Sequence, residues 1–206
     1  CLAVHGGSII ASAGNGIFAS GADGAWVRRS THASDIVCLA PVGHDGLAIA
    51  LADGDILIEG GAFDGQRYQA GSLNCLTAMV ADNDHLYVAN GSATNGVGDW
   101  QRDLLERNSS GSIWRIDLGS GAATRIADRL AWPAGLALDD QGLVLSEAWR
   151  HQLVRIGLAA GGPKIVLHAD LPAYPGRIAP AGNGYWLALF APRSQLVEFV
   201  LREPPY

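Results

Sequence analysis

The sequence predicts an all-β protein, a β-propeller built from four-stranded antiparallel blades. Glycine accounts for 27 of the 206 residues and 49% of the residues are apolar, a composition typical of short buried segments separated by many turns. The apolar runs, such as 47–51 and 185–189, are too short for helices. Related segments also recur about every forty residues, which is the range of periods found in repeat architectures.

The repeat is clearest in the second half of the chain. Residues 112–116 (Ser-Ile-Trp-Arg-Ile) recur as 152–156 (Gln-Leu-Val-Arg-Ile) and as 195–199 (Gln-Leu-Val-Glu-Phe), and we expect each copy to form an outer strand of a blade. The segment 130–136 is similarly echoed by 171–178. Asp-Gly and Asn-Gly pairs between the apolar runs supply the positive φ that tight hairpins need.

This spacing divides the chain into about five blades of one propeller domain, residues 1–206. Repeated meanders close into rings because stacking buries both faces of each blade. The last blade lacks a clear outermost strand, so we expect it to be incomplete. The expected blades are 1–30, 35–70, 73–127, 130–170 and 171–206.

Residues 92–111 break the pattern and are inserted between two strands of the third blade. Asp99 is expected to cap a short helix on which Trp100 and Leu104 share a face. Long loops on rigid repeats usually serve a binding face. We therefore predict that this insertion is a lid over one mouth of the central channel.

Composition excludes several classes of partner. Charged residues make up 17% of the chain and the net charge is −6, so no basic surface is expected for nucleic acid. Three cysteines without CxxC spacing predict neither a disulfide framework nor a zinc site. No apolar run reaches the length of a membrane span, so we expect a soluble protein, with cytoplasm and periplasm left open. The chain starts inside an apolar stretch, and we expect it to be part of a longer one.

Several motifs resemble the bacterial strictosidine synthase-like propellers, which are related to the gluconolactonase and paraoxonase groups. The resemblance covers residues 73–200. It implies six blades, a central channel and a site for a small organic molecule at one mouth, with the sixth blade supplied by the rest of the chain or by a homo-oligomer. The motifs that carry it are 88–92, 99–104, 110–115, 130–133, 146–151, 171–175 and 184–189.

The resemblance also allows the metal-ligand positions to be compared, because related propellers hold calcium with oxygen ligands from the starts of innermost strands. This sequence has Pro-Ala-Gly at 133–135 where relatives have Pro-Asn-Gly, and Pro-Gly-Arg at 175–177 where they have Pro-Asp-Asn. In the third blade the corresponding place is Leu76-Thr77. We therefore expect no metal and no other cofactor. The glutamate that strictosidine synthase uses lies in a last blade beyond this sequence.

Glu147 is the first choice for a catalytic residue. Aligning the second strands of the blades places Glu147 and Asn90 at equivalent positions, so both side chains are expected at one mouth. A partly buried carboxylate beside a cleft acquires a raised pKa that suits a general acid or base. The alternative is a structural role, in which Glu147 pairs with Arg150 or accepts backbone N–H bonds.

The remaining candidates are expected to bind the ligand. Arg177 is expected to enter the vacated metal cavity and pair with Glu147, the alternative being a surface arginine. Asp45 is expected to begin an innermost strand, the alternative being a turn aspartate. The tryptophans are either blade packing or a binding cage. The full ligand-binding set is Asn90, Asp45, Thr77, Trp100, Arg150 and Arg177.

Two functions remain open. The first is a strictosidine synthase-like enzyme acting on a small organic molecule by metal-independent acid/base chemistry or by lactone or ester hydrolysis. The second is a non-catalytic propeller that binds a small ligand or serves as a scaffold, with a degenerate metal site. A fold supports many chemistries, so the site itself has to decide between them.

Overall fold

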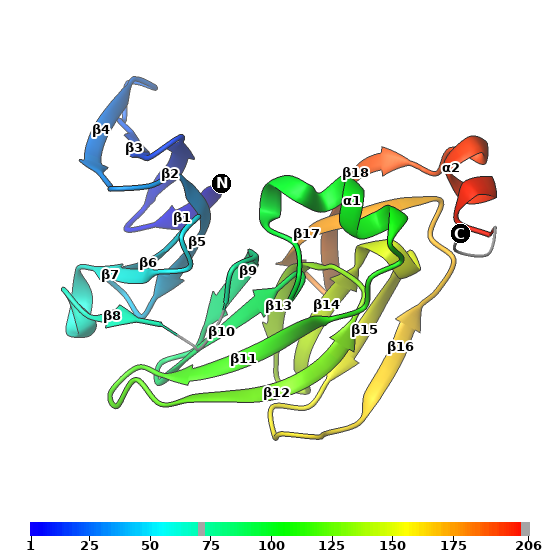
Figure 1. Cartoon of the computed structure of the whole chain (residues 1–206). Coiled ribbons are helices and arrows are strands. Elements are labelled where there is room, and N and C mark those ends of the chain that lie inside the picture. Colours follow the sequence, from blue (N-terminus) through cyan, green and yellow to red (C-terminus); the bar gives the residue numbers. More distant parts are fainter. Residues whose placement is uncertain (70–72, 203–206) are drawn as a thin grey trace.

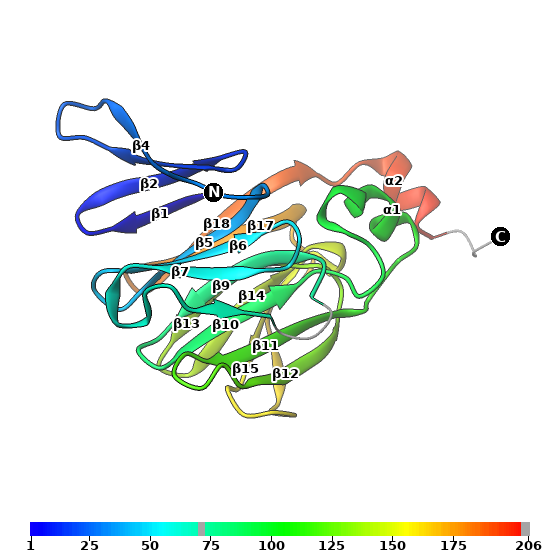
Figure 2. The same ribbon diagram turned by 60° about the vertical axis from the view of Figure 1, so that its left-hand side comes forward.

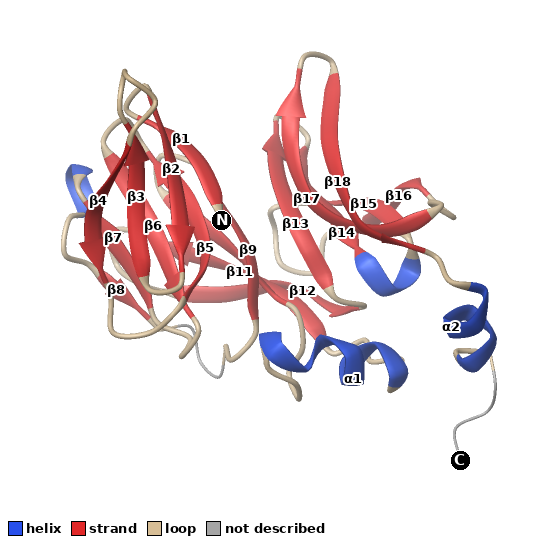
Figure 3. Ribbon diagram, turned by 90° about the horizontal axis from the view of Figure 1, so that it is seen from above, coloured by secondary structure: helices blue, strands red, loops and turns tan. Residues whose placement is uncertain are grey.

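The computed structural model describes residues 1–69 and 73–202, and the all-β prediction is confirmed. Five antiparallel sheets follow one another along the chain and are arranged around a common axis (Figures 1 and 3). The first four sheets each have four strands in chain order. They match the first four expected blades to within a few residues.

The strands of the first two sheets are β1 (Leu2–His5), β2 (Ser8–Ala13), β3 (Gly16–Ser20), β4 (Trp26–Thr31), β5 (Ile36–Val42), β6 (Gly46–Leu51), β7 (Ile56–Glu59) and β8 (Arg67–Tyr68). Those of the next two are β9 (Leu76–Ala81), β10 (His85–Asn90), β11 (Gly111–Asp117), β12 (Ala123–Leu130), β13 (Pro133–Asp139), β14 (Gly142–Glu147), β15 (Gln152–Ile156) and β16 (Lys164–His168). The fifth sheet has β17 (Ala173–Ala181) and β18 (Gly184–Pro192). Short helices are η1 (Gly61–Phe63), η2 (Val97–Asp99), α1 (Trp100–Leu105), η3 (Ala148–Arg150) and α2 (Gln195–Val200).

The hairpins follow the turn chemistry only in part. Positive φ occurs as expected at the glycine of three Asp-Gly pairs, Gly24, Gly54 and Gly65. At two Asn-Gly pairs the positive φ belongs instead to the glycine before the asparagine, Gly14 and Gly182. The sequence therefore located these turns correctly but not the residue that carries the unusual conformation.

Hydrophobic cores lie between neighbouring blades. The second strands β6 and β14 are buried along their whole length, because a blade inside the stack has a neighbour on each face. This accounts for their continuous apolar sequences. Each core joins residues of two successive sheets, as in the pairs Ile10 with Leu47, Ile56 with Leu86, Tyr87 with Leu145, and Val144 with Ile178.

The prediction of an outer strand at 195–199 is wrong, because these residues form the helix α2. In the fifth sheet no further strand within the described residues pairs with β18, so β18 forms an edge of that sheet. A helix satisfies its own backbone groups. Glu198 in α2 accepts hydrogen bonds from Arg193 at 2.8 Å and Tyr174 at 3.4 Å, which hold the helix against the fifth sheet.

All five sheets line a central channel of about 840 Å³. Large apolar side chains are exposed on the first and fifth sheets, including Leu2 and Trp186, the latter 75% exposed. Figure 3 shows these two sheets facing each other at the open part of the ring. Among the described residues, no helix has the length and apolar character needed to cross a membrane.

Candidate functional site

A one-residue β-bulge recurs in the first strand of four blades. In β5, for example, the pairing passes from Ile36 opposite Leu51 to Cys38 opposite Ala50, so Val37 is the extra residue. Bulges re-aim side chains and are frequent beside active sites. The bulge residues of the four blades are Val37 in β5, Thr77 in β9, Ala134 in β13 and the pair Gly176 and Arg177 in β17.

All of these bulge residues line one cavity of about 450 Å³, which we call the mouth cavity. The insertion borders it with Val97 of η2 and Trp100 of α1, and Figure 1 shows α1 lying across this end of the blades. In the structure β10 ends at Asn90 and β11 begins at Gly111, so the segment between them contains η2 and α1. Asp99 is the N-terminal flanking residue of α1 but makes no side-chain capping bond, so that expectation is wrong.

Aromatic rings form much of the wall of the mouth cavity. Trp132 and Trp149 stack with ring centroids 5.2 Å apart, and Trp100 meets Phe190 edge-on at 5.7 Å. Phe190 also contacts Trp149 at 6.3 Å. The sequence predicted Trp100 as a ligand residue, left Trp132 and Trp149 between blade packing and a binding cage, and gave no prediction for Phe190. The other three rings come from three separate segments, so no local pattern could join them.

Asp103 of α1 fixes this aromatic wall, and sequence reasoning missed it. Its carboxylate is fully buried. One oxygen accepts a hydrogen bond from Nε1 of Trp149 at 2.8 Å, and the other accepts bonds from Asn95 at 3.0 Å and Asn108 at 2.8 Å. The insertion is therefore bonded to the fourth blade through Trp149.

Arg177 reaches into the channel but does not pair with Glu147, so the predicted ion pair is wrong. Its guanidinium donates to the carbonyl oxygen of Val37 at 3.0 Å and to the sulfur of Cys38 at 3.1 Å. The bulge in β17 directs the side chain across the channel toward β5, whereas Glu147 lies on the second strand of the fourth blade. Arg177 lines both the mouth cavity and the central channel.

Glu147 is enclosed by partners. Its side chain is 0% exposed. One oxygen accepts bonds from the Ala131 amide at 3.0 Å and Arg150 at 2.6 Å, and the other from Gln152 at 2.5 Å and Lys164 at 2.7 Å. Burial raises the pKa of Glu147, but the bonds from Lys164, Ala131 and Gln152 outweigh it and leave the pKa lowered. The raised pKa expected for a general acid or base is therefore not found.

Asn90 occupies the equivalent place in the third blade, as the alignment predicted. Its side-chain oxygen accepts a bond from the Cys75 amide at 3.0 Å, just as Glu147 accepts one from Ala131. In both blades the last residue of the second strand thus fastens the segment leading into the first strand. Neither Asn90 nor Glu147 lines the mouth cavity or the central channel.

Asp45 does not begin an innermost strand; the structure shows the alternative, a turn aspartate. It lies in the hairpin turn between β5 and β6, where its side chain is 72% exposed and contacts His44 at 2.6 Å. The repeat alignment was displaced, and the residue of the second blade at the mouth is Val37. Arg150 is bonded to Glu147 and to the carbonyl of Arg129, and it lines a separate, smaller cavity.

The mouth cavity does not suit calcium, which takes six to eight oxygen ligands. Among the bulge residues only Thr77 has a side-chain oxygen, and its hydroxyl donates to the carbonyl of Pro133. Arg177 adds a fixed positive charge where a cation would lie. Within residues 1–69 and 73–202, no group of three or more His, Cys, Asp or Glu side chains is arranged to hold a metal.

No family model matches the sequence, and no curated protein matches it. Solved structures do match the fold. Virginiamycin B lyase from Staphylococcus aureus has a TM-score of 0.68 at 17% identity, covering 93% of this chain and 63% of that one. A chain of the nidogen/laminin complex has a TM-score of 0.68 at 18% identity, with 89% and 68% covered. A gluconolactonase from Xanthomonas campestris has a TM-score of 0.68 at 15% identity, with 88% and 66% covered.

These likenesses establish the propeller fold. The matched proteins have different names, so the fold alone does not indicate one function. The chain spans about two thirds of the length of these neighbours, and only 63% of virginiamycin B lyase. Two of these three neighbours are a gluconolactonase and a virginiamycin B lyase. The more specific resemblance to strictosidine synthase-like proteins stays a prediction.

Proposed function

We propose that this chain binds a small, largely apolar organic molecule in the mouth cavity and that Arg177 holds an acidic or carbonyl oxygen of that molecule. A volume of about 450 Å³ lies within the range of small-molecule sites, which combine apolar and aromatic walls with a few polar groups. The rings of Trp100, Trp149 and Phe190 provide flat apolar surfaces for a ring-containing ligand.

The observation that carries this proposal is the charge of Arg177. Its hydrogen-bond partners are the neutral Val37 carbonyl and two cysteine sulfurs, of Cys38 and Cys1. No carboxylate of the described residues forms a salt bridge with it. A cation between apolar walls attracts an anionic group more strongly than one in water.

A panel of aromatic carboxylates and their uncharged amides tests this proposal, with tryptophan fluorescence as the measurement. We expect the carboxylates to bind more tightly, Arg177→Gln to abolish the preference for the charged form, and Arg177→Lys to retain part of it. Arg29→Gln, at an exposed residue of β4, is the matched control. Equal binding of acid and amide to the unaltered protein would contradict the role given to Arg177.

The second candidate is a metal-independent lyase or hydrolase. It is favoured by the structural neighbours named as a lyase and a gluconolactonase. In such an enzyme Arg177 would stabilise the negative oxygen that develops as a lactone or ester is attacked. The described residues of the mouth cavity include no His, Asp or Glu, so the general base would have to come from elsewhere. We therefore place binding first.

A lactone and ester panel, assayed with and without calcium, separates the two candidates. We expect no calcium-dependent turnover, since the bulge residues do not suit that ion. Metal-independent turnover that Arg177→Gln removes would establish the enzyme in place of the binding module. Calcium-dependent turnover would contradict our reading of the bulge residues.

A further inference from the structure

We propose that the ligand is a fatty acyl compound, in which Arg177 holds the acyl oxygen and an unbranched alkyl chain extends into the central channel. This inference rests on the proposed function, in which Arg177 holds an acidic or carbonyl oxygen, and it adds the chemical nature of the group attached there. Arg177 and Ala188 line both the mouth cavity and the central channel, so the two spaces meet at these residues.

The channel begins where the mouth cavity ends. In β9 the bulge residue Thr77 lines the mouth cavity and residues 78–81 line the channel. In β17 Arg177 lines both spaces, and residues 178–180 continue along the channel. The first strands β5, β9, β13 and β17 lie side by side (Figure 2), so the channel runs along these strands, away from the mouth.

The walls of the channel suit an apolar chain with one charged or polar end. Among the lining residues that the structure describes, only Arg177 has a side chain with a permanent charge. Its guanidinium lies at the mouth end, where it donates to the carbonyl of Val37 at 3.0 Å. Each of the five sheets contributes at least one alanine, whose short side chain leaves space along the axis. These alanines include Ala3, Ala40, Ala78, Ala137 and Ala179.

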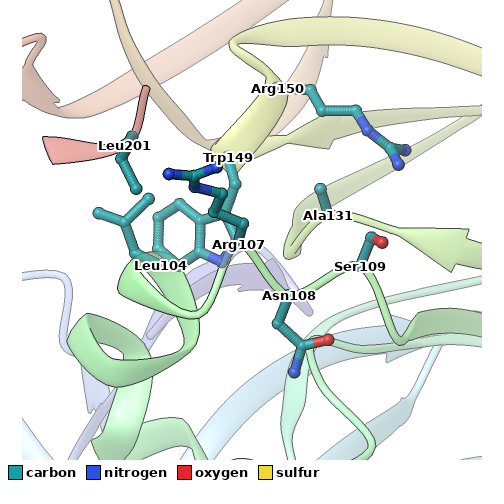
Figure 4. A pocket seen from close by; sticks show the side chains of 8 residues that line it. All are labelled: Leu104, Arg107, Asn108, Ser109, Ala131, Trp149, Arg150 and Leu201. Atoms are coloured by element: carbon teal, nitrogen blue, oxygen red, sulfur yellow. The ribbon is translucent and has the colours of Figure 1, made fainter. Parts of the chain in front are cut away.

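Trp149 separates the mouth cavity from the smaller cavity between α1 and α2. Its indole donates to Asp103 at 2.8 Å, and Leu104 and Leu201 lie next to the ring (Figure 4). Of the described residues that line these two cavities, Trp149 alone belongs to both. A chain that starts at Arg177 therefore extends into the central channel rather than into the smaller cavity.

The depth of the channel sets the length of the chain. From Thr77 to Ala81 the strand β9 advances by about 13 Å, at about 3.3 Å per residue. An extended alkyl chain advances by about 1.25 Å per carbon, because its bonds of about 1.5 Å meet at nearly tetrahedral angles. The channel therefore matches an acyl group of about ten carbons.

The first test titrates unbranched alkanoates, from butyrate to dodecanoate, into the full chain by calorimetry. We expect each added methylene up to decanoate to tighten binding by about two- to fourfold, because it is removed from water. Dodecanoate should bind no more tightly than decanoate, because its last carbons pass the end of the channel. Affinity that does not change with chain length would overturn the proposal. Affinity that still rises from decanoate to dodecanoate would place the chain on the exposed apolar faces of the first and fifth sheets and would also overturn it.

The second test narrows the channel with Ala179→Phe. Ala179 is an exposed residue of β17 that lines the channel about 7 Å beyond Arg177 along the strand. The variant should bind butyrate as before and decanoate at least about tenfold more weakly. Ala122→Phe is the matched control, because Ala122 is exposed in the turn before β12 and lies outside the channel. Unchanged binding of decanoate to Ala179→Phe would refute the assignment.

Decanamide, the uncharged equivalent of decanoate, separates this inference from the proposed function. A preference for decanoate over decanamide that Arg177→Gln removes, combined with no effect of chain length, would support the role of Arg177 and refute the channel as the site of the chain. Equal binding of decanoate and decanamide to the unaltered protein would refute the role of Arg177, and this inference with it.

Discussion

Replacing Glu147 with glutamine distinguishes a structural glutamate from a catalytic one. The buried carboxylate accepts bonds from four donors, two on each oxygen. Glutamine has one accepting oxygen and one donating NH2 group, so either orientation leaves two donors facing the NH2 group. It also removes the charge that Arg150 and Lys164 share. Removing one member of a buried charge cluster costs about 3–5 kcal/mol.

With a urea dependence of about 2 kcal/mol per molar for a chain of this size, that loss lowers the unfolding midpoint by about 1.5–2.5 M. The assay is urea unfolding followed by circular dichroism. Glu59→Gln is the control, because the Glu59 side chain is 42% exposed, and it should move the midpoint by much less. An unchanged midpoint for Glu147→Gln, together with loss of an enzymatic activity, would refute the structural role.

The difference in urea unfolding midpoint between the wild type and Glu147→Gln should also depend on pH. In the folded protein the pKa of Glu147 is lowered from its ordinary value of 4.5. Its contribution to stability is therefore complete above about pH 4.5 and is lost as the pH falls through the folded-state pKa. We expect the gap between the unfolding midpoints of wild type and Glu147→Gln to narrow below pH 4.5.

Three further predictions concern other parts of the molecule. Asp103→Asn removes a charged acceptor from three donors and should lower the free energy of unfolding by about 2–4 kcal/mol. Tryptophan fluorescence should also change, because Trp149 loses its hydrogen-bond partner. Unchanged stability and unchanged emission would contradict this prediction. Burial raises the pKa of the Cys75 thiol to about 12, so an alkylating reagent at pH 8 should modify exposed Cys1 long before Cys75, as mass spectrometry can show. The exposed apolar faces of the first and fifth sheets should make the 206-residue chain melt at a modest temperature that rises with protein concentration; a high melting temperature independent of concentration would count against this.

The blades were predictable because their signals are local. Short apolar runs and Asp-Gly or Asn-Gly pairs fix where strands and turns lie, and β6 shows this with six buried residues between two turns. The segment 195–199 has the same local signal as 152–156 and still forms α2. Pairing with other strands decides between these outcomes, and sequence periodicity does not report it.

The site was predicted less completely than the fold. Thr77 and Arg177 were singled out by comparison with the calcium positions of related propellers, and both line the mouth cavity. Asp45 was misplaced because the alignment of the second blade rested on its hairpin turn rather than on its bulge. Asp103 gave no signal, since its importance comes from a bond to Trp149 that joins positions 46 residues apart.

The recurring bulge has a consequence for how this propeller could acquire new ligand preferences. Each bulge residue is the unpaired extra position of its strand, so its side chain can change while the neighbouring residues keep their backbone partners. The mouth cavity therefore has four positions at which the side chain can be exchanged, namely Val37, Thr77, Ala134 and Arg177. A library restricted to these codons would sample many pocket chemistries on an unchanged scaffold.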